Sequence, residues 1–370
     1  MTILPEGVKY FYNKHKNLFA GLQLILFLYL FMFSLDLMGA SLKMFGKDFA
    51  NTLIETTTNP FIGLFIGILA TSVIQSSSST TSIVVGMVAA GALNIENAIP
   101  IVMGANIGTS VTTFLAAFPQ INRGAEFKRA FAAATVHDFF NIMSVILLLP
   151  LQINTNFLGI SAGYLGEKFQ NVGGLTFLSP VKAMTKPLVL LIKDLVGPDL
   201  PWLMLIIALG FLFASLKYMV DSLKILVVSK AKSWFDKILF KTSLRSFLVG
   251  LILTVMVQSS SITVSLMVPM AGAGILTLFQ IFPYTLGANI GTTVTAILAA
   301  LITGNPAAIV VAFSHSLFNI CGLIIWWPLK KIPIFIAQRF AELSTKNKLI
   351  PVGFVVFTFF LMPILVIYLF

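Results

Sequence analysis

Seven apolar runs of membrane-spanning length constrain this chain more than any other feature of its sequence. A helix needs about 20 apolar residues to cross a hydrocarbon core of about 30 Å. Apolar residues make up 58% of the 370-residue chain and charged residues 10%, which leaves too little polar surface for a soluble globule. The sequence therefore predicts an all-α polytopic membrane protein. The predicted crossings are residues 18–45, 98–118, 127–150, 201–228, 281–303, 307–330 and 351–370.

The chain also contains an internal duplication. Residues 75–117 align with residues 258–300 at a constant offset of 183 without a gap, and 23 of these 43 positions are identical. Further along, the offset becomes 178, so that "HDFFN" at 137–141 meets "HSLFN" at 315–319. Self-similarity of this kind indicates a repeated structural unit. We assign repeat 1 to residues 18–150 and repeat 2 to residues 201–330.

Within each repeat a polar run divides a long apolar segment. Residues 61–93 would form an unbroken helix roughly 50 Å long, well beyond the hydrocarbon core. "QSSSSTTS" at 75–82 instead separates two half-length helices, which fits a re-entrant hairpin whose tip is buried in protein or lines a watery cavity. The equivalent hairpin of repeat 2 is predicted at 246–275. Since three full crossings precede the second copy, we expect the two repeats to be inverted relative to each other.

The distribution of basic residues predicts the orientation in the membrane. If the N-terminus is cytoplasmic, 16 of the 24 Lys and Arg residues fall on inside segments and six on outside segments, as the positive-inside rule requires. The formal charge of +11 is dispersed among short loops, which argues against nucleic acid as a partner. The remaining segments are predicted as a cytoplasmic N-terminus (1–17), an external connector with an interfacial helix (151–200), a cytoplasmic interfacial segment (331–350) and a C-terminal transmembrane helix (351–370).

The two hairpin tips carry groups that suit an anion and a cation together. The half-helix that begins after each tip directs free backbone N–H groups and the positive end of its dipole at the tip, which favours an oxyanion. The hydroxyls and the Gln amide add neutral donors. The half-helix that ends before the tip offers free carbonyls, which suit a hard cation such as Na⁺. The predicted anion-binding residues are Gln75, Ser76, Ser77, Ser78, Gln258, Ser259, Ser260 and Ser261.

A second polar motif, "GANIGT", recurs in the span after each hairpin. Gly, Asn and hydroxyl side chains at the middle of a span weaken an ordinary helix, so we expect an interrupted transmembrane helix in each repeat. Hydrogen bonding between helices, or close packing of small residues, is the alternative explanation for all these polar positions. The candidate sodium ligands are Ser79, Thr80, Asn106, Thr109, Thr112, Thr263, Asn289, Thr292 and Thr295.

Ionisable side chains follow in the next span of repeat 1. His137 and Asn141 are four residues apart and share a helix face. A hydrogen-bonded His–Asn pair that supports the site is expected, with a proton relay as the alternative. The predicted supporting residues are His137, Asp138, Asn141, His315 and Asn319.

No enzyme motif accompanies these residues. The sequence has no GxSxG, no HExxH and no phosphate-binding GxxxxGK[ST], and Cys321 is its single cysteine. We therefore expect a protein that is not an enzyme, has no cofactor and binds no metal other than Na⁺ as a coupling ion.

The paired "QSSS" and "GANIGT" segments, "RAFAAATVHDFFN" at 129–141 and "HSLFN" resemble the type II sodium-dependent phosphate cotransporter family. The resemblance implies a symporter of the plasma membrane, a secondary active transporter that takes up inorganic phosphate with Na⁺. It also implies that the two QSSS tips bind phosphate and Na⁺. A pair of inverted repeats is consistent with transport by alternating access. The long disulfide-bearing external loop of animal members has no counterpart here, which points to a bacterial-type member.

Other functions stay open at this stage. A Na⁺-coupled carrier of a dicarboxylate or of sulfate would use similar hairpins, and a passive anion channel would need no Na⁺ gradient. A purely structural membrane protein would show no uptake. The expected partners are phosphate, Na⁺ and the lipid bilayer, and a homodimer is kept as an alternative to a monomer.

Overall fold

The structure, a computed structural model, describes residues 15–171, 179–231 and 240–369, and this part of the chain is helical without a strand. Seven of its helices are long and apolar enough to cross a membrane. They coincide with the seven predicted runs and confirm the polytopic all-α fold class. They are α2 (Lys16–Met44), α6 continued by α7 (Ile95–Gly108 and Val111–Ala117), α8 (Ala125–Thr155), α11 (Pro201–Ala231), α14 (Leu278–Thr303), α15 (Pro306–Trp326) and the C-terminal α17 and α18 (Leu349–Val356 and Met362–Leu369), joined by a π-helical turn (Phe357–Leu361).

Shorter helices occupy the two predicted hairpins. Each hairpin consists of two helices of 13 to 15 residues with a break at its QSSS tip. They are α4 (Pro60–Ile74) and α5 (Ser77–Ala90) in repeat 1, and α12 (Ser243–Val257) and α13 (Ser260–Gly272) in repeat 2.

Four further helices lie outside the spans and hairpins. Helices occur where the connector and the segment after residue 330 were predicted to carry interfacial segments, as α10 and α16, and their place at the membrane surface stays a prediction. Two other helices were not predicted from the sequence. The first of these, α3, meets α4 at an angle of 99°. The predicted N-terminal segment up to residue 14 lies outside the described residues. The four helices are α3 (Lys47–Thr56), α9 (Phe157–Asn171), α10 (Ser179–Val196) and α16 (Lys331–Lys346).

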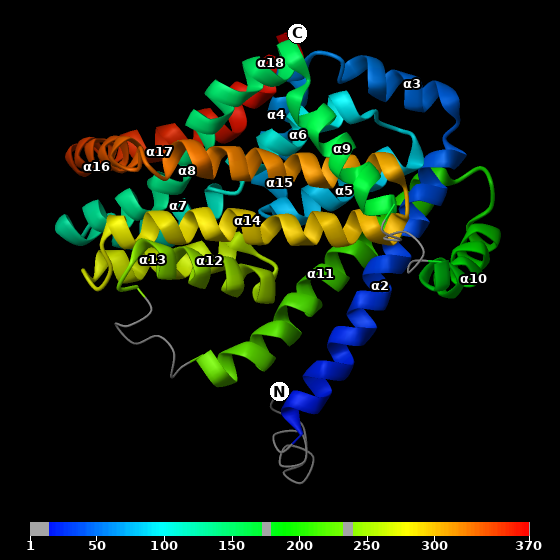
Figure 1. The fold of residues 1–370 in the computed structure, drawn as a ribbon, viewed down its shortest axis with the longest axis horizontal. Coiled ribbons are helices and arrows are strands. Elements are labelled where there is room, and N and C mark those ends of the chain that lie inside the picture. Colours follow the sequence, from blue (N-terminus) through cyan, green and yellow to red (C-terminus); the bar gives the residue numbers. More distant parts are fainter. Residues whose placement is uncertain (1–14, 172–178, 232–239, 370) are drawn as a thin grey trace.

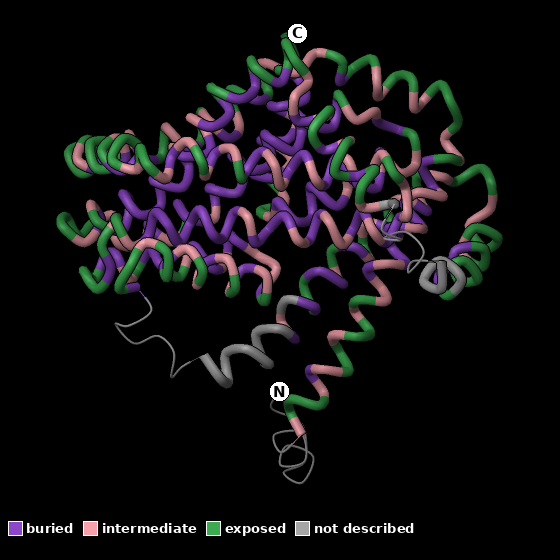
Figure 2. The backbone as a smooth tube through the Cα atoms, viewed as in Figure 1, coloured by how far each residue is buried: buried purple, intermediate pink, exposed green. Residues whose placement is uncertain are grey.

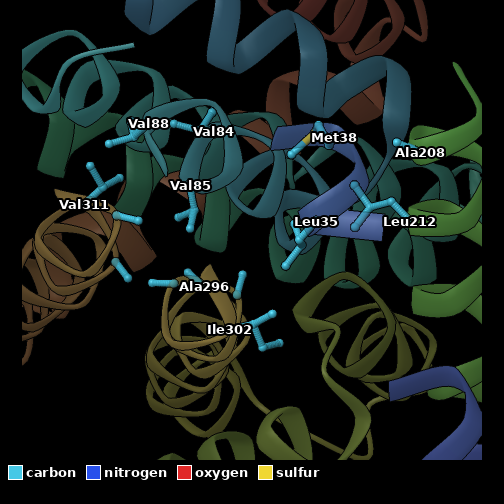
Figure 3. Close-up of a cluster of buried hydrophobic side chains, with 14 of the residues drawn as sticks. Leu35, Met38, Val84, Val85, Val88, Ala208, Leu212, Ala296, Ile302 and Val311 are labelled. Carbon is cyan, nitrogen blue, oxygen red and sulfur yellow. The ribbon is translucent and has the colours of Figure 1, made fainter. Parts of the chain in front are cut away.

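Two long helices stand apart from the rest of the fold. Figure 1 shows α2 and α11 side by side, extending together away from the other helices. Helix α10 is hydrogen-bonded to α2, for example through the Tyr29 hydroxyl and the Met184 carbonyl at 3.1 Å. The contact of the pair with the hairpins and central spans is an apolar cluster that includes Leu35 and Met38 of α2, Leu212 of α11, Val85 of α5 and Ala296 of α14 (Figure 3). Because apolar contacts of this kind have no directional requirement, this interface can tolerate sliding better than a hydrogen-bonded one.

The two arms of each hairpin differ in the repeats that they contact. The first arm stays within its own repeat, since α4 lies on α6 and α12 lies on α14. The second arm contacts both repeats: α5 packs on α2 and α6 and also on α14 and α15, and α13 packs on α14 and also on α7 and α8. Figure 2 shows buried residues concentrated along α14 and α15 at the centre, and exposed residues on α16 and on the end of α2. The hairpins therefore interlock the two repeats.

Glycines let the first arm of each hairpin approach its partner helix at the distance of backbone contact. A Cβ atom added at Gly67 of α4 or at Gly104 of α6 would lie 2.0 or 1.9 Å from a backbone oxygen of the facing helix. The equivalent Gly250 and Gly287 would place a Cβ atom 2.1 and 2.0 Å from such an oxygen. Only glycine fits these four positions, so both repeats use the same packing.

The expected interruption of the GANIGT helix occurs in repeat 1 alone. There α6 ends at Gly108 and α7 begins at Val111. In repeat 2 the expectation was wrong, because α14 runs unbroken through the motif. Gly291 lies against the α12 backbone, and the Thr292 hydroxyl donates to the Ala288 carbonyl at 3.0 Å. In repeat 1, Gly108 lies against α4 and Thr109 donates to the Ala105 carbonyl in the same way, so the motif by itself does not decide whether the helix breaks.

An ion-pair network fastens α16 to α8. Lys128 Nζ lies 2.6 Å from Glu342 Oε1, and Arg339 Nη1 lies 3.0 Å from Glu342 Oε2. The hydrogen bond from Lys128, followed by that from Arg339, holds the pKa of Glu342 below its ordinary value of 4.5. Since the folded state lowers this pKa, the network stabilises the fold above pH 4.5, and the contribution is lost as the pH falls through the lowered pKa.

We expect Glu342→Gln to remove this part of the acid sensitivity. The fall in melting temperature between pH 7 and about pH 3 should be smaller in the variant than in the native chain, by a modest amount because the pair is exposed. Thermal unfolding of the two purified proteins at both pH values checks this. An equal fall in both would show that the network adds nothing to stability.

Candidate functional site

Both hairpins break with the same unusual backbone turn. Gln75 has φ 57° and ψ 28°, and the equivalent Gln258 has φ 53° and ψ 30°, values that non-glycine residues seldom adopt. The following residues, Ser76 and Ser259, are extended, with φ −151° and −152°. The break therefore lies where the polar run predicted it, and the two tips are copies of one structure.

A threonine pair holds the two arms of each hairpin together behind the tip. The Thr71 hydroxyl donates to the Thr80 hydroxyl at 3.0 Å, and those of Thr254 and Thr263 are 2.8 Å apart. Residues nine positions apart in an unbroken helix would be separated by roughly 13 Å. The chain thus turns back at each tip, and the hydroxyls of Thr80 and Thr263, two predicted sodium ligands, are engaged within their own hairpins.

Each tip surrounds a helix N-terminus with hydroxyls. Ser76 Oγ accepts from the Ser79 amide at 3.2 Å and from the Ser79 hydroxyl at 2.8 Å, and Ser259 Oγ accepts from the Ile262 amide at 3.4 Å. The other first-turn N–H groups of α5 and α13 have no partner within their own helices, and the positive dipole ends coincide with them. Five buried serines lie in these first turns: Ser77, Ser78, Ser79, Ser260 and Ser261.

The two tips contact each other although 180 residues separate them. The Ser78 hydroxyl donates to the Gln258 carbonyl at 3.2 Å. The Gln258 side-chain oxygen is buried and has no hydrogen-bond partner, whereas Gln75 is exposed. The tips are therefore copies in backbone shape but differ in surroundings, and they place two helix N-termini at one locality.

The Asn and His residues form one hydrogen-bond network across both repeats. His137 Nε2 lies 2.5 Å from Asn289 Oδ1, and Asn289 Nδ2 donates to Asn141 Oδ1 at 2.8 Å. Asn141 Nδ2 in turn donates to the Asn106 carbonyl at 3.0 Å, and His315 Nε2 lies 3.3 Å from Asn106 Oδ1. The predicted pair within repeat 1 is present, with Asn141 Nδ2 3.3 Å from His137 Nε2. What the sequence did not predict is that each histidine also bonds an asparagine of the other repeat.

Some predicted site residues are engaged locally, whereas the predicted supporting residue Asn319 keeps an atom without a hydrogen-bond partner. The hydroxyls of Thr109 and Thr292 each donate to the carbonyl four residues before them, at 3.0 Å. Asn319 Nδ2 donates to the His315 carbonyl at 3.2 Å, but its Oδ1 is buried without a hydrogen-bond partner.

Unpartnered buried hydroxyls occur at equivalent positions of both repeats. Thr112 and Thr295 form one such pair, and Ser82 and Ser265 form another. A buried hydroxyl without a partner costs free energy, and both copies of the repeat retain this arrangement. Ser82 and Ser265 were not among the predicted site residues, although both copies retain this serine at the same distance from QSSS.

Asp138 is fully buried, and neither carboxylate oxygen makes a hydrogen bond of normal geometry, although the Ser110 hydroxyl is close enough to interact with it. At the equivalent position repeat 2 carries Ser316, whose hydroxyl donates to the Ala312 carbonyl of its own helix at 3.2 Å. A buried carboxylate without compensating donors is costly, and a bound cation would relieve that cost. Within the described residues no three His, Cys, Asp or Glu side chains gather as for a transition metal.

Comparison with known proteins places this arrangement in a family. The family model described as Na+/Pi-cotransporter matches residues 30–166 and 206–359. The chain is 33% identical over 473 residues to sodium-dependent phosphate transport protein 2B of Homo sapiens, covering 99% of this chain and 68% of that protein. It is 32% identical over 419 residues to protein 2A of Rattus norvegicus, with coverages of 92% and 66%. No solved structure matches the chain. The chain belongs to the Na⁺/phosphate cotransporter family, among the type II sodium-dependent phosphate transporters.

Proposed function

We propose that this protein is a symporter that couples the entry of Na⁺ to the uptake of inorganic phosphate, at one site between the two QSSS tips. The observation that carries the proposal is the contact of Ser78 with the Gln258 carbonyl, which brings the N-termini of α5 and α13 together. The names of the relatives, sodium-dependent phosphate transport proteins, agree with it.

Phosphate would be bound by donors from both tips. It is a tetrahedral anion, and its oxygens accept several hydrogen bonds at once. The first-turn N–H groups of the two helices and their serine hydroxyls supply donors from two directions, with two positive dipole ends. Neither tip alone surrounds a tetrahedral ion. The residues proposed for phosphate are Gln75, Ser76, Ser77 and Ser78 with Gln258, Ser259, Ser260 and Ser261.

Sodium would be bound by the neutral oxygens that lack partners and by the buried carboxylate of Asp138. Na⁺ prefers hard oxygen ligands. Gln258 Oε1, Thr112 Oγ1 and Thr295 Oγ1 are buried acceptors without a hydrogen bond, and Asp138 adds a negative charge. The hydroxyls of Thr109 and Thr292 retain free lone pairs, because each acts as a donor in its own helix.

Coupling follows from the cost of moving a partly filled site. An empty site would expose unsatisfied hydroxyls and Asp138 to a low dielectric, whereas Na⁺ and phosphate together satisfy them. The two repeats, inverted in a cell membrane with a cytoplasmic N-terminus, would alternate access to the two sides. The interlocked hairpins and central spans would move against the α2–α11 pair, where the contact is apolar.

Uptake of labelled phosphate into proteoliposomes tests this function. We expect uptake that depends on an inward Na⁺ gradient and falls at least about tenfold when choline replaces Na⁺, since an unneutralised site should not move. Unlabelled phosphate should compete, and sulfate and succinate should not. Uptake that is unaffected by choline would identify a passive channel, and competition by succinate or sulfate would identify a carrier of another anion; either result would refute the proposal.

A further inference from the structure

At its C-terminal end, the second arm of each hairpin accepts hydrogen bonds from a side chain of the other repeat. In repeat 2, α13 ends at Gly272, whose carbonyl accepts two hydrogen bonds from Arg129 of α8, from Nε at 2.9 Å and from Nη2 at 2.6 Å. The last carbonyls of a helix have no partner within it and form the negative end of its dipole. A guanidinium that donates twice to one of them therefore caps the helix with its preferred charge.

The equivalent carbonyl in repeat 1 is capped in the same manner. Ala89 of α5 corresponds to Gly272 at the offset of 183, and its carbonyl accepts from Asn305 Nδ2 at 3.1 Å. Asn305 is also the N-cap of α15, because its Oδ1 accepts from the amides of Ala307 and Ala308 at 2.9 and 3.4 Å. One side chain thus joins the end of α5 to the start of α15.

These contacts fix the ends of the arms opposite to the tips. An arm of 13 or 14 residues is about 20 Å long and behaves as a short rod. The N-terminus of each rod presents the donors of the tip, and its C-terminus is held by Arg129 or Asn305. A displacement or tilt at the capped end therefore moves the donors at the other end.

We propose that Arg129 and Asn305 are positioning residues, each of which holds one QSSS tip in place through the far end of its arm. The proposal rests on the function proposed above, in which the tips bind the substrate. Arg129 positions the tip of repeat 2 and Asn305 the tip of repeat 1, each from the opposite repeat. Arg129 donates two charge-assisted hydrogen bonds to the end of α13, whereas Asn305 donates one neutral hydrogen bond to the end of α5. The cap of α13 should therefore be the stronger of the two.

The test measures each tip separately. In a Cys321→Ala background, a cysteine is placed at Ser77 or at the equivalent Ser260, both buried at the starts of the arms. The rate of alkylation by N-ethylmaleimide in purified protein then reports how often each tip opens. These cysteine variants are used for labelling only.

The capping residues are changed so that their other contacts survive. Asn305→Asp retains the oxygen that caps α15 and removes the donor to Ala89. Arg129→Gln removes the positive charge and the pair of hydrogen bonds to the Gly272 carbonyl. Arg129→Lys keeps the charge and can still donate one hydrogen bond to that carbonyl. Arg123→Gln is the matched control, because Arg123 lies just before α8 and pairs with Glu126 at an exposed position.

Each cap should affect its own tip alone. Arg129→Gln should accelerate labelling at residue 260 about tenfold or more, the scale of a lost charge-assisted hydrogen bond, and leave residue 77 within about twofold. Asn305→Asp should accelerate labelling at residue 77, by a smaller factor, and leave residue 260 nearly unchanged. Arg129→Lys should label residue 260 more slowly than Arg129→Gln does. Equal acceleration at both tips, or none at either, would overturn the proposal.

Transport of the variants with native tips gives a second readout. Arg129→Gln should raise the KM for phosphate several-fold with equal amounts of folded protein, Arg129→Lys should return it towards the native value, and Arg123→Gln should leave it unchanged. An unchanged KM in Arg129→Gln would contradict a positioning role. If the native protein showed no Na⁺-dependent phosphate uptake, the proposed function would fail, and the labelling experiment would still decide whether the caps hold the tips.

Discussion

Replacement of Asp138 by serine is expected to lower the apparent affinity for Na⁺ in phosphate uptake by about 100-fold or more. Asp138 is fully buried and makes no hydrogen bond of normal geometry, and it is the carboxyl group of the proposed site, whose ionised form a bound Na⁺ would stabilise. Removing one partner from a buried ion pair costs about 3 kcal/mol or more, which corresponds to about two orders of magnitude in affinity. Serine is the residue that repeat 2 carries at this position, so the helix should accept it.

The same variant should move one Na⁺ fewer with each phosphate. The measurements are the Na⁺ dependence of phosphate uptake and the ratio of labelled Na⁺ to phosphate entering the vesicles. Asp138→Asn keeps the shape of the side chain and should lower the Na⁺ affinity and the ratio of Na⁺ to phosphate in the same way. Ser316→Ala should leave the Na⁺ affinity and the ratio unchanged. Native Na⁺ affinity and an unchanged ratio in Asp138→Ser would exclude the carboxylate as a sodium ligand.

Replacement of Gly104 by alanine is expected to destabilise the fold by about 3 kcal/mol or more, the upper range for overpacking of a core. The new Cβ atom would lie 1.9 Å from the Leu64 carbonyl oxygen and 2.9 Å from its carbon. Both are backbone atoms of α4, so no flexible side chain can move aside. The helices α4 and α6 would have to separate, and the tip of repeat 1 would move with α4.

Thermal unfolding in detergent checks this prediction, with Gly287→Ala as the equivalent change in repeat 2. Gly39→Ala in α2 is the matched control, because nothing lies within 4 Å of a Cβ atom added there. The control should be neutral or more stable by up to about 1 kcal/mol, given the higher helix propensity of alanine. A melting temperature for Gly104→Ala equal to that of the control would contradict the tight contact of α4 with α6.

The sequence predicted those features that depend on length and on local polarity. The seven spans follow from apolar runs that match the thickness of a membrane, and the breaks at Gln75 and Gln258 follow from a polar run within a segment too long for one crossing. Because the two segments are copies, the duplication predicted that both tips have the same backbone structure. The identical turns at the two tips agree with this.

Contacts between the repeats could not be predicted from the sequence, because they join residues 140 or more positions apart. The bonds of His137 to Asn289 and of Arg129 to Gly272 are examples. Periodicity shows which residues share a helix face but not which helix that face meets. The continuous α14 was not predicted either, because the same motif with the same close packing is broken in repeat 1 and unbroken in repeat 2.

Calorimetric titration of the purified protein with phosphate in the presence of Na⁺ tests the central claim, one site made by two tips. We predict one phosphate per chain, with an affinity that falls at least about tenfold in Ser78→Ala and also in the equivalent Ser261→Ala, since each removes a donor from the shared site. Binding of two phosphates per chain, or native affinity in either variant, would contradict the account.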